Sequence, residues 1–125
     1  MITYLWIAIG SALGGAARYG VTLWAARAWG ETFPWGTLLI NILGSFVIGL
    51  FFNLTMADGP LPASANVRLF VMSGLCGGFT TFSAFSLDAL TLWERDPWMA
   101  GSYVAGSVLL SFAAIVAGLL LSRMA

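Results

Sequence analysis

Four long apolar stretches, separated by short polar segments, occupy most of this sequence. A helix needs about 20 apolar residues to cross the hydrocarbon layer of a bilayer. All four stretches are of about this length, and they run from about Tyr4 to Trp24, Thr37 to Leu54, Val67 to Leu92, and Met99 to Ser122. The sequence therefore predicts an all-α membrane protein, a single domain of four transmembrane helices over residues 1–125.

The segments between the stretches have the composition of loops. Arg27–Gly36, Thr55–Asn66 and Trp93–Trp98 each carry proline, glycine or charged residues, which interrupt helices or prefer water. Most of the tryptophans stand near the ends of the apolar stretches, where indole rings favour the interface between lipid and water. We expect a multi-pass protein of the inner or plasma membrane of the cell, surrounded by membrane lipid.

The polar composition excludes several classes of function. Five arginines balance five acidic residues, and the chain has neither lysine nor histidine. No basic patch is available for nucleic acid, and no histidine can serve as a metal ligand or a general base. The single cysteine, Cys76, forms no disulfide within the chain and reads as a small packed thiol. Because the serines and this cysteine lack an acid–base partner, the sequence does not predict an enzyme.

The third apolar stretch contains the segment Gly77–Ser86, which is unusual for a membrane helix. It joins a pair of glycines to several hydroxyl residues and to phenylalanines three positions apart. Irregular backbone is not tolerated against lipid, because each unpaired amide or carbonyl there costs several kcal/mol. We therefore expect a helix broken at Gly77–Thr81 that faces protein, an ion or a water-filled cavity. Broken membrane helices often present backbone carbonyls to cations.

The arginines give no preference for one orientation in the membrane. With four spans, both termini and the Thr55–Asn66 loop share one side, which holds Arg68 and Arg123, while Arg27 and Arg95 lie on the other. Lysine and arginine normally orient a membrane protein by their excess on the cytoplasmic side. The balance predicts insertion in both orientations, so that two opposite copies pair about an axis in the membrane plane. The alternative is one orientation set by the first helix.

At the level of motifs, the chain resembles the Fluc (CrcB) family of fluoride channels over its whole length. The Gly77–Ser86 segment carries the most specific part of the resemblance. Further matching residues lie in Gly14–Tyr19 of the first stretch and at Gly36, Thr37, Asn41, Gly44 and Gly49 of the second. The resemblance implies an antiparallel dual-topology homodimer with two fluoride pores. Its implied role is passive export of fluoride from the cytoplasm, which gives fluoride resistance.

The resemblance also implies a structural Na⁺ at the dimer interface. Gly77 and Thr80 match the family positions whose backbone carbonyls, from both subunits, hold this ion. The alternative for the glycine pair is a packing kink, because small residues also permit close approach of helices.

Phe82 and Phe85 are three residues apart and therefore lie on one face of a helix. Such a pair is, by itself, more often part of a core or in contact with lipid. Within the motif it matches a family pair of pore phenylalanines. The edge of an aromatic ring carries partial positive charge, so the two rings are expected to stabilise an anion that has lost its water.

Several polar side chains are further candidates for the pore. Asn41 offers amide donors in the middle of the second stretch and is either a pore donor or an interhelical hydrogen-bonding residue. Ser107 and Ser111 lie four residues apart on one stripe of the fourth stretch, which Tyr103 extends by a turn. Serines in membrane helices commonly bond their own backbone carbonyls instead. Thr81 contributes its hydroxyl either to the pore or to helix bonding.

Two charged residues fall within the stretches. A guanidinium inside a span is costly, so Arg18 should snorkel, pair or face water. The resemblance places it at an aqueous vestibule, where it raises the local concentration of anions. Asp88 stands where relatives commonly carry glutamate, and its role is left open.

Two other classes of function compete with a channel. A small multidrug exporter also has four spans and can insert in both orientations, but exchange for protons requires a carboxylate within the membrane. The first stretch has none, and Asp88 is the one candidate elsewhere. A structural subunit without transport activity would not require aligned hydroxyls, an aromatic pair and a helix break together.

Overall fold

The computed structural model describes residues 1–125 and contains helices and connecting segments, without a β-strand. Its first, second and last helices are continuous. The third predicted span is divided into α3, the π-helix η1, and the short α4 and longer α5. In chain order the elements are α1 (Ile2–Trp29), α2 (Trp35–Leu54), α3 (Ala65–Leu69), η1 (Phe70–Cys76), α4 (Gly77–Phe79), α5 (Ser83–Arg95) and α6 (Pro97–Arg123). The prediction of an all-helical chain is confirmed.

Three segments are long and apolar enough to cross a membrane: α2, the joined segment Ala65–Arg95, and α6. With 28 residues, α1 has the necessary length. It is less apolar than the other three, because Gly14, Gly15 and Arg18 interrupt its hydrophobic residues. The chain is a multi-pass membrane protein, and four helical segments follow one another in the predicted order.

The connections at one end of the bundle are shorter than predicted. Helix α1 continues through Arg27 to Trp29 and ends at Gly30, whose φ of +80° favours glycine. Only Asp96 separates α5 from α6. Its carboxylate accepts hydrogen bonds from the backbone N–H groups of Trp98 and Met99, at 3.1 and 3.4 Å, and so caps α6. The predicted Trp93–Trp98 loop is therefore a sharp helical turn.

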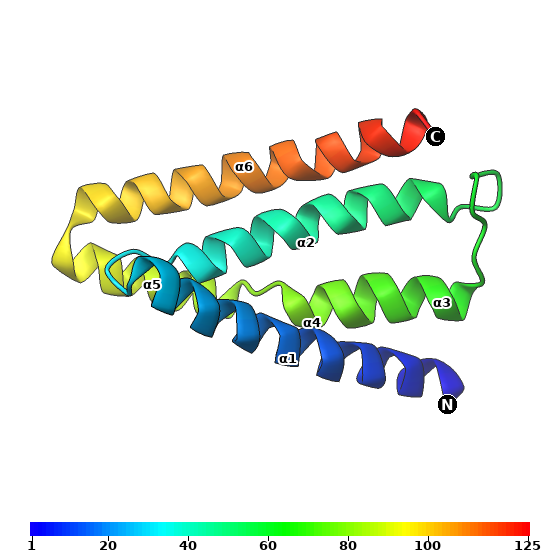
Figure 1. Ribbon diagram of the computed structural model, residues 1–125, viewed down its shortest axis with the longest axis horizontal. Helices are drawn as coiled ribbons and strands as arrows, with labels where there is room; N and C mark the ends of the chain where they lie inside the picture. The colour runs from blue at the N-terminus through cyan, green and yellow to red at the C-terminus, as the bar shows by residue number, and fades with distance from the viewer.

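Both chain termini and the α2–α3 connection lie at the same end of the bundle, while the α1–α2 and α5–α6 connections lie at the other (Figure 1). This arrangement makes α2 and α6 parallel. Arg68 and Arg123 belong to segments at the first end, and Arg27 and Arg95 belong to segments at the second. The equal division of the loop arginines therefore holds in three dimensions.

Glycines allow the helical backbones to touch. A Cβ atom added at Gly49 of α2 would lie 2.3 Å from the carbonyl oxygen of Ile115 in α6. One added at Gly14 of α1 would lie 2.3 Å from the carbonyl oxygen of Leu75 in η1. Small residues have this effect in membrane bundles, where close van der Waals packing replaces the hydrophobic effect. The two contacts bring α6 against α2, and η1 against α1.

The break in the third span lies at Thr80–Phe82, so the predicted position at Gly77–Thr81 is corrected toward the C-terminus. Gly77 has helical dihedral angles, φ −63° and ψ −38°, whereas Thr80 is extended, with φ −78° and ψ 158°. A continuing helix would bond the N–H of Thr81 to the carbonyl of Gly77. That N–H donates instead to Oδ1 of Asn41, at 2.9 Å. A contact from another helix, rather than the glycine pair alone, ends α4.

Candidate functional site

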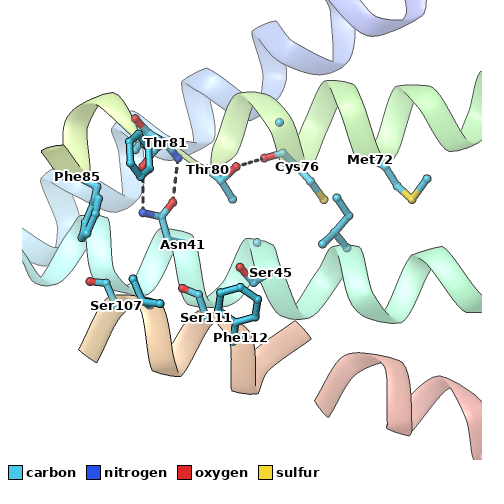
Figure 2. A pocket seen from close by; sticks show the side chains of 15 residues that line it. Asn41, Ser45, Met72, Cys76, Thr80, Thr81, Phe85, Ser107, Ser111 and Phe112 are labelled. Carbon is cyan, nitrogen blue, oxygen red and sulfur yellow. Dashed lines mark hydrogen bonds between the residues drawn. The ribbon is translucent and has the colours of Figure 1, made fainter. Parts of the chain in front are cut away.

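Asn41 connects α2 to the break through two hydrogen bonds (Figure 2). Its Oδ1 accepts from the N–H of Thr81 at 2.9 Å, and its Nδ2 donates to the carbonyl of Thr81 at 3.0 Å. One turn further along α2, a Cβ atom at Gly44 would lie 2.2 Å from Cγ2 of Thr80. Asn41 thus makes the interhelical bonds that the sequence left as an alternative. Its second amide N–H bonds no protein atom and is free to donate.

Arg18 reaches the same break from α1, where its Nε donates to the carbonyl of Gly78 at 3.1 Å. The predicted vestibule residue is therefore paired with backbone, and its guanidinium compensates one carbonyl that the break has released from helix bonding. This bond and those of Asn41 attach the break to two different helices.

The remaining carbonyls at the break divide into two groups. The carbonyl of Cys76 accepts from both the N–H and the Oγ1 of Thr80, at 2.9 and 2.8 Å. The carbonyls of Gly77, Phe79 and Thr80 accept no hydrogen bond within the chain. Of these three residues, Gly77 and Thr80 line the adjacent cavity. The residues predicted to ligate a cation thus have carbonyls without a partner in the chain, and both residues line the cavity.

A cavity of about 370 Å³ lies between α2, the break and α6 (Figure 2). It brings together most of the predicted site residues, namely Asn41, Gly77, Thr80, Thr81, Phe82, Phe85, Ser107 and Ser111. The other lining residues were not predicted as part of the site, although Gly44 and Cys76 were noted for other reasons; they are Gly44, Ser45, Ile48, Met72, Cys76, Val108 and Phe112. Of these residues, Ser45 could have been predicted from the sequence, because it follows Asn41 by four residues and therefore lies on the same face of α2.

The serines that line the cavity have hydroxyls without a partner in the chain. Ser107 is 5% exposed, and its hydroxyl has no hydrogen-bond partner. Ser45 and Ser111 also bond no protein atom. Many other helical hydroxyls donate to the carbonyl three or four residues earlier, as do Thr22, Thr55, Thr80, Thr91, Ser86, Ser102 and Ser122. Ser11 and Ser73, outside the cavity, are like the cavity serines in having no such bond. The three cavity serines therefore keep their O–H groups available.

The two predicted phenylalanines line the cavity in different environments. Phe85 is 9% exposed and packs against Tyr103, with ring centroids 5.2 Å apart. Phe82 is 80% exposed and lies at the break itself, with its centroid 5.7 Å from that of Phe85 and the ring planes at 48°. One ring is fixed within the packed helices, and the other is open on the surface of the single chain.

Tyr103 lies behind Phe85 and is not among the residues that line the cavity. It is 1% exposed, and its ring meets that of Phe33 edge to face at 5.5 Å. Its hydroxyl donates to the Asp88 carboxylate at 3.3 Å. The predicted hydroxyl stripe of α6 therefore reaches the cavity at Ser107 and Ser111, while its Tyr103 end forms a pair with Asp88.

Free hydroxyls, aromatic rings and unpaired carbonyls beside a broken membrane helix are typical of membrane proteins that bind and pass ions. The fold and the cavity define the chain as a helical membrane protein of this class. Residues 5–119 match the family described as CrcB-like protein, Camphor Resistance (CrcB), and the chain belongs to this family. The membership that the sequence motifs indicated is confirmed.

Curated relatives carry more specific names. The chain is 54% identical over 116 residues to the fluoride-specific ion channel FluC of Methylocella silvestris, covering 92% of this chain and 88% of the relative. It is 51% identical over 124 residues to the protein of the same name from Rhizobium etli, with 98% of each chain covered. The Gluconobacter oxydans protein of that name is 54% identical over 118 residues, covering 93% and 81%. The chain thus belongs to a family of ion channels and is not an enzyme.

Proposed function

We propose that this chain forms a fluoride channel that exports the ion passively. The observation that carries the proposal is the Ser107 hydroxyl, which is buried beside the cavity without a partner. A buried donor without an acceptor costs about 1–3 kcal/mol, and a small anion in the cavity would accept its hydrogen bond. The names of the curated relatives identify fluoride as the anion to test.

The lining of the cavity suits an anion that must lose water. Asn41 has one unused amide N–H, and Ser107 and Ser111 have free hydroxyls. No acidic side chain lines the cavity to repel an anion. The rings of Phe82 and Phe85 supply weakly positive edges. Such donors can replace hydration, and a path of several weak ligands still allows the ion to leave.

Transport by this route needs no energy source other than the gradient. A membrane potential that is negative inside contributes about 2.3 kcal/mol per 100 mV toward expelling a monovalent anion. A channel of this kind in the inner or plasma membrane would lower cytoplasmic fluoride and so give fluoride resistance.

The working unit in this proposal is an antiparallel dimer with two pores. Gly77 and Phe82 are exposed in the single chain although both line the cavity, so a second copy would complete the wall on that side. The equal distribution of arginines between the two ends of the bundle supports insertion in both orientations.

The unpaired carbonyls of Gly77 and Thr80 fit a hard cation such as Na⁺, which takes oxygen ligands. Two antiparallel copies would contribute four such oxygens, and bound Na⁺ would supply positive charge that offsets the repulsion between these dipoles. Within the chain, a Cβ atom at Gly77 would meet one atom only, the Met72 carbonyl oxygen at 3.7 Å. The chain itself therefore leaves room at this position for an ion or a partner.

Purified protein in liposomes tests the main proposal. We expect rapid fluoride efflux when a potassium ionophore clamps the voltage, and chloride efflux close to that of protein-free liposomes. The curated relatives are named fluoride-specific, and the free hydroxyl and amide donors can replace part of the water that a small anion loses. Equal efflux of both anions would contradict a fluoride-selective channel, and efflux of neither would contradict a channel function.

Removing Na⁺ tests the cation. We expect prolonged dialysis against N-methylglucamine buffer to reduce fluoride efflux, and Na⁺ to restore it. Gly77→Ala should raise the Na⁺ concentration needed, while Gly101→Ala, at a position with no atom within 4 Å of the added Cβ, should not. Because the ion is structural, the reversal potential should follow the fluoride gradient alone. A reversal potential that moves with the Na⁺ gradient would indicate coupled transport instead.

A further inference from the structure

Ser45 is a cavity residue to which neither the sequence motifs nor the family resemblance assigned a role. It lies on α2 four residues after Asn41, and its half-buried side chain lines the cavity. Its hydroxyl bonds no protein atom. Serines in membrane helices commonly bond the carbonyl one turn earlier, as Ser102 does with the Trp98 carbonyl at 2.9 Å. The hydroxyl of Ser45 is therefore free to donate to a ligand in the cavity.

The packing of α2 on α6 places Ser45 beside the fourth-span serines. The two helices are parallel (Figure 1), and the contact between Gly49 and Ile115 holds their backbones together just beyond the cavity. Asn41 and Ser45 occupy successive turns of α2, as Ser107 and Ser111 do on α6. Ser45 and Ser111 both line the cavity, and Figure 2 shows Ser45 one turn further along α2 than Asn41, on the side of that helix toward α6.

Opposite Ser45, the cavity is closed by apolar and sulfur-containing side chains. Met72 and Cys76 of η1 line this part. Neither of them is a strong hydrogen-bond donor. An anion that moves past Asn41 toward this region would therefore depend on the hydroxyls of Ser45 and Ser111.

We infer that Ser45 is a further anion ligand, which together with Ser111 forms a second position for fluoride beyond the one near Asn41, Ser107 and Phe85. The inference rests on the proposed channel function. At this position two neutral hydroxyls from facing helices replace water. A small anion accepts short, strong hydrogen bonds from this pair, which offset part of its large dehydration cost.

The test compares variants in the liposome efflux assay, with wild-type protein measured alongside. Ser45→Ala should lower fluoride efflux about fivefold, since a net hydrogen bond contributes about 1 kcal/mol. Ser45→Thr keeps a hydroxyl and should stay within about twofold of wild type. Ser102→Ala is the matched control, because it removes a serine that bonds its own helix away from the cavity. That control should leave efflux unchanged.

A double-mutant cycle then distinguishes a shared ion from independent effects. If Ser45 and Ser111 hold the same ion, the loss in Ser45→Ala/Ser111→Ala should be smaller than the product of the single losses. Ser45→Cys, close in size but a weak donor, provides a second variant if Ser45→Ala does not elute as folded protein. Wild-type efflux from folded Ser45→Ala or Ser45→Cys would overturn the assignment while leaving the channel function intact. Absence of efflux from the wild-type protein would instead reject the channel function itself.

Discussion

Replacing Phe85 with isoleucine is expected to reduce fluoride efflux by more than about tenfold. The substitution keeps an apolar side chain but removes the ring edge, and aromatic edge interactions contribute about 1 kcal/mol each. Loss of this ring also releases its contact with Tyr103, at 5.2 Å between centroids, and with Phe82, at 5.7 Å. Both the anion contact and its support are lost. The measurement is the rate of fluoride efflux from liposomes that contain equal amounts of each protein.

Phe70→Ile is the control for the loss of an aromatic ring elsewhere in the bundle. Phe70 packs edge to face against Trp6, at 5.7 Å, and does not line the cavity. This variant should retain efflux, and size-exclusion chromatography should show the same assembly for both variants. Phe82→Ile should behave like Phe85→Ile. Wild-type efflux from both Phe82→Ile and Phe85→Ile would exclude ring edges as part of the anion path.

Fixing the orientation of the chain is expected to reduce efflux to near background. Ala57→Lys with Asp58→Lys places two positive charges in the exposed α2–α3 connection. Because the arginines are balanced, this small bias should orient nearly every copy in the same way. Antiparallel pairs would then be rare. The measurement is fluoride efflux, together with accessibility of a tag at the C-terminus.

Coexpression of an oppositely biased chain is the internal control. Glu31→Lys with Glu94→Lys places the charges at the other end of the bundle, in exposed positions away from the Asp96 cap. Each biased chain alone should be inactive, and the two together should recover efflux. Full activity from one biased chain, with all its C-termini on one side, would support a parallel assembly.

The apolar pattern predicted the helical segments correctly, because about 20 apolar residues can satisfy their backbone in lipid only as a helix. It predicted their ends less well. Arg27 and Trp29 read as loop residues, yet α1 continues to Trp29, since a helix can extend beyond the lipid without loss of backbone bonding. Asp96 similarly shortens a predicted loop to one residue by capping α6.

The position of the break was only approximately predictable. Glycine weakens a helix wherever it occurs, so the sequence predicts that the break starts at Gly77. In the folded chain Gly77 and Gly78 are both helical, and the break begins where Asn41 takes the N–H of Thr81. This contact joins residues that are 40 positions apart. Local sequence gives no sign of such competition between a side chain and a distant helix.

Which predicted residues line the cavity also depends on contacts between distant parts of the chain. Ser107 and Ser111 were identified from their spacing, but spacing does not reveal whether a serine hydroxyl bonds its own helix. The structure separates free hydroxyls such as Ser107 from bonded ones such as Ser102. Tyr103 shares the periodicity of the two serines, yet Phe85 lies between it and the cavity. The packing of the helices, which the spacing of residues does not reveal, decides that Tyr103 lies behind the Phe85 ring.

The close contact between α2 and α6 has a consequence for the biosynthesis of the chain. Gly49 and Ile115 are separated by about half of the sequence, so α6 leaves the ribosome after α2 and the broken third span. Asn41 can pair with Thr81 before α6 has been synthesised. Until then the side of the cavity that α6 supplies to Ser45 is absent. The side of the cavity that Ser107 and Ser111 line is therefore completed only after α6 has been inserted.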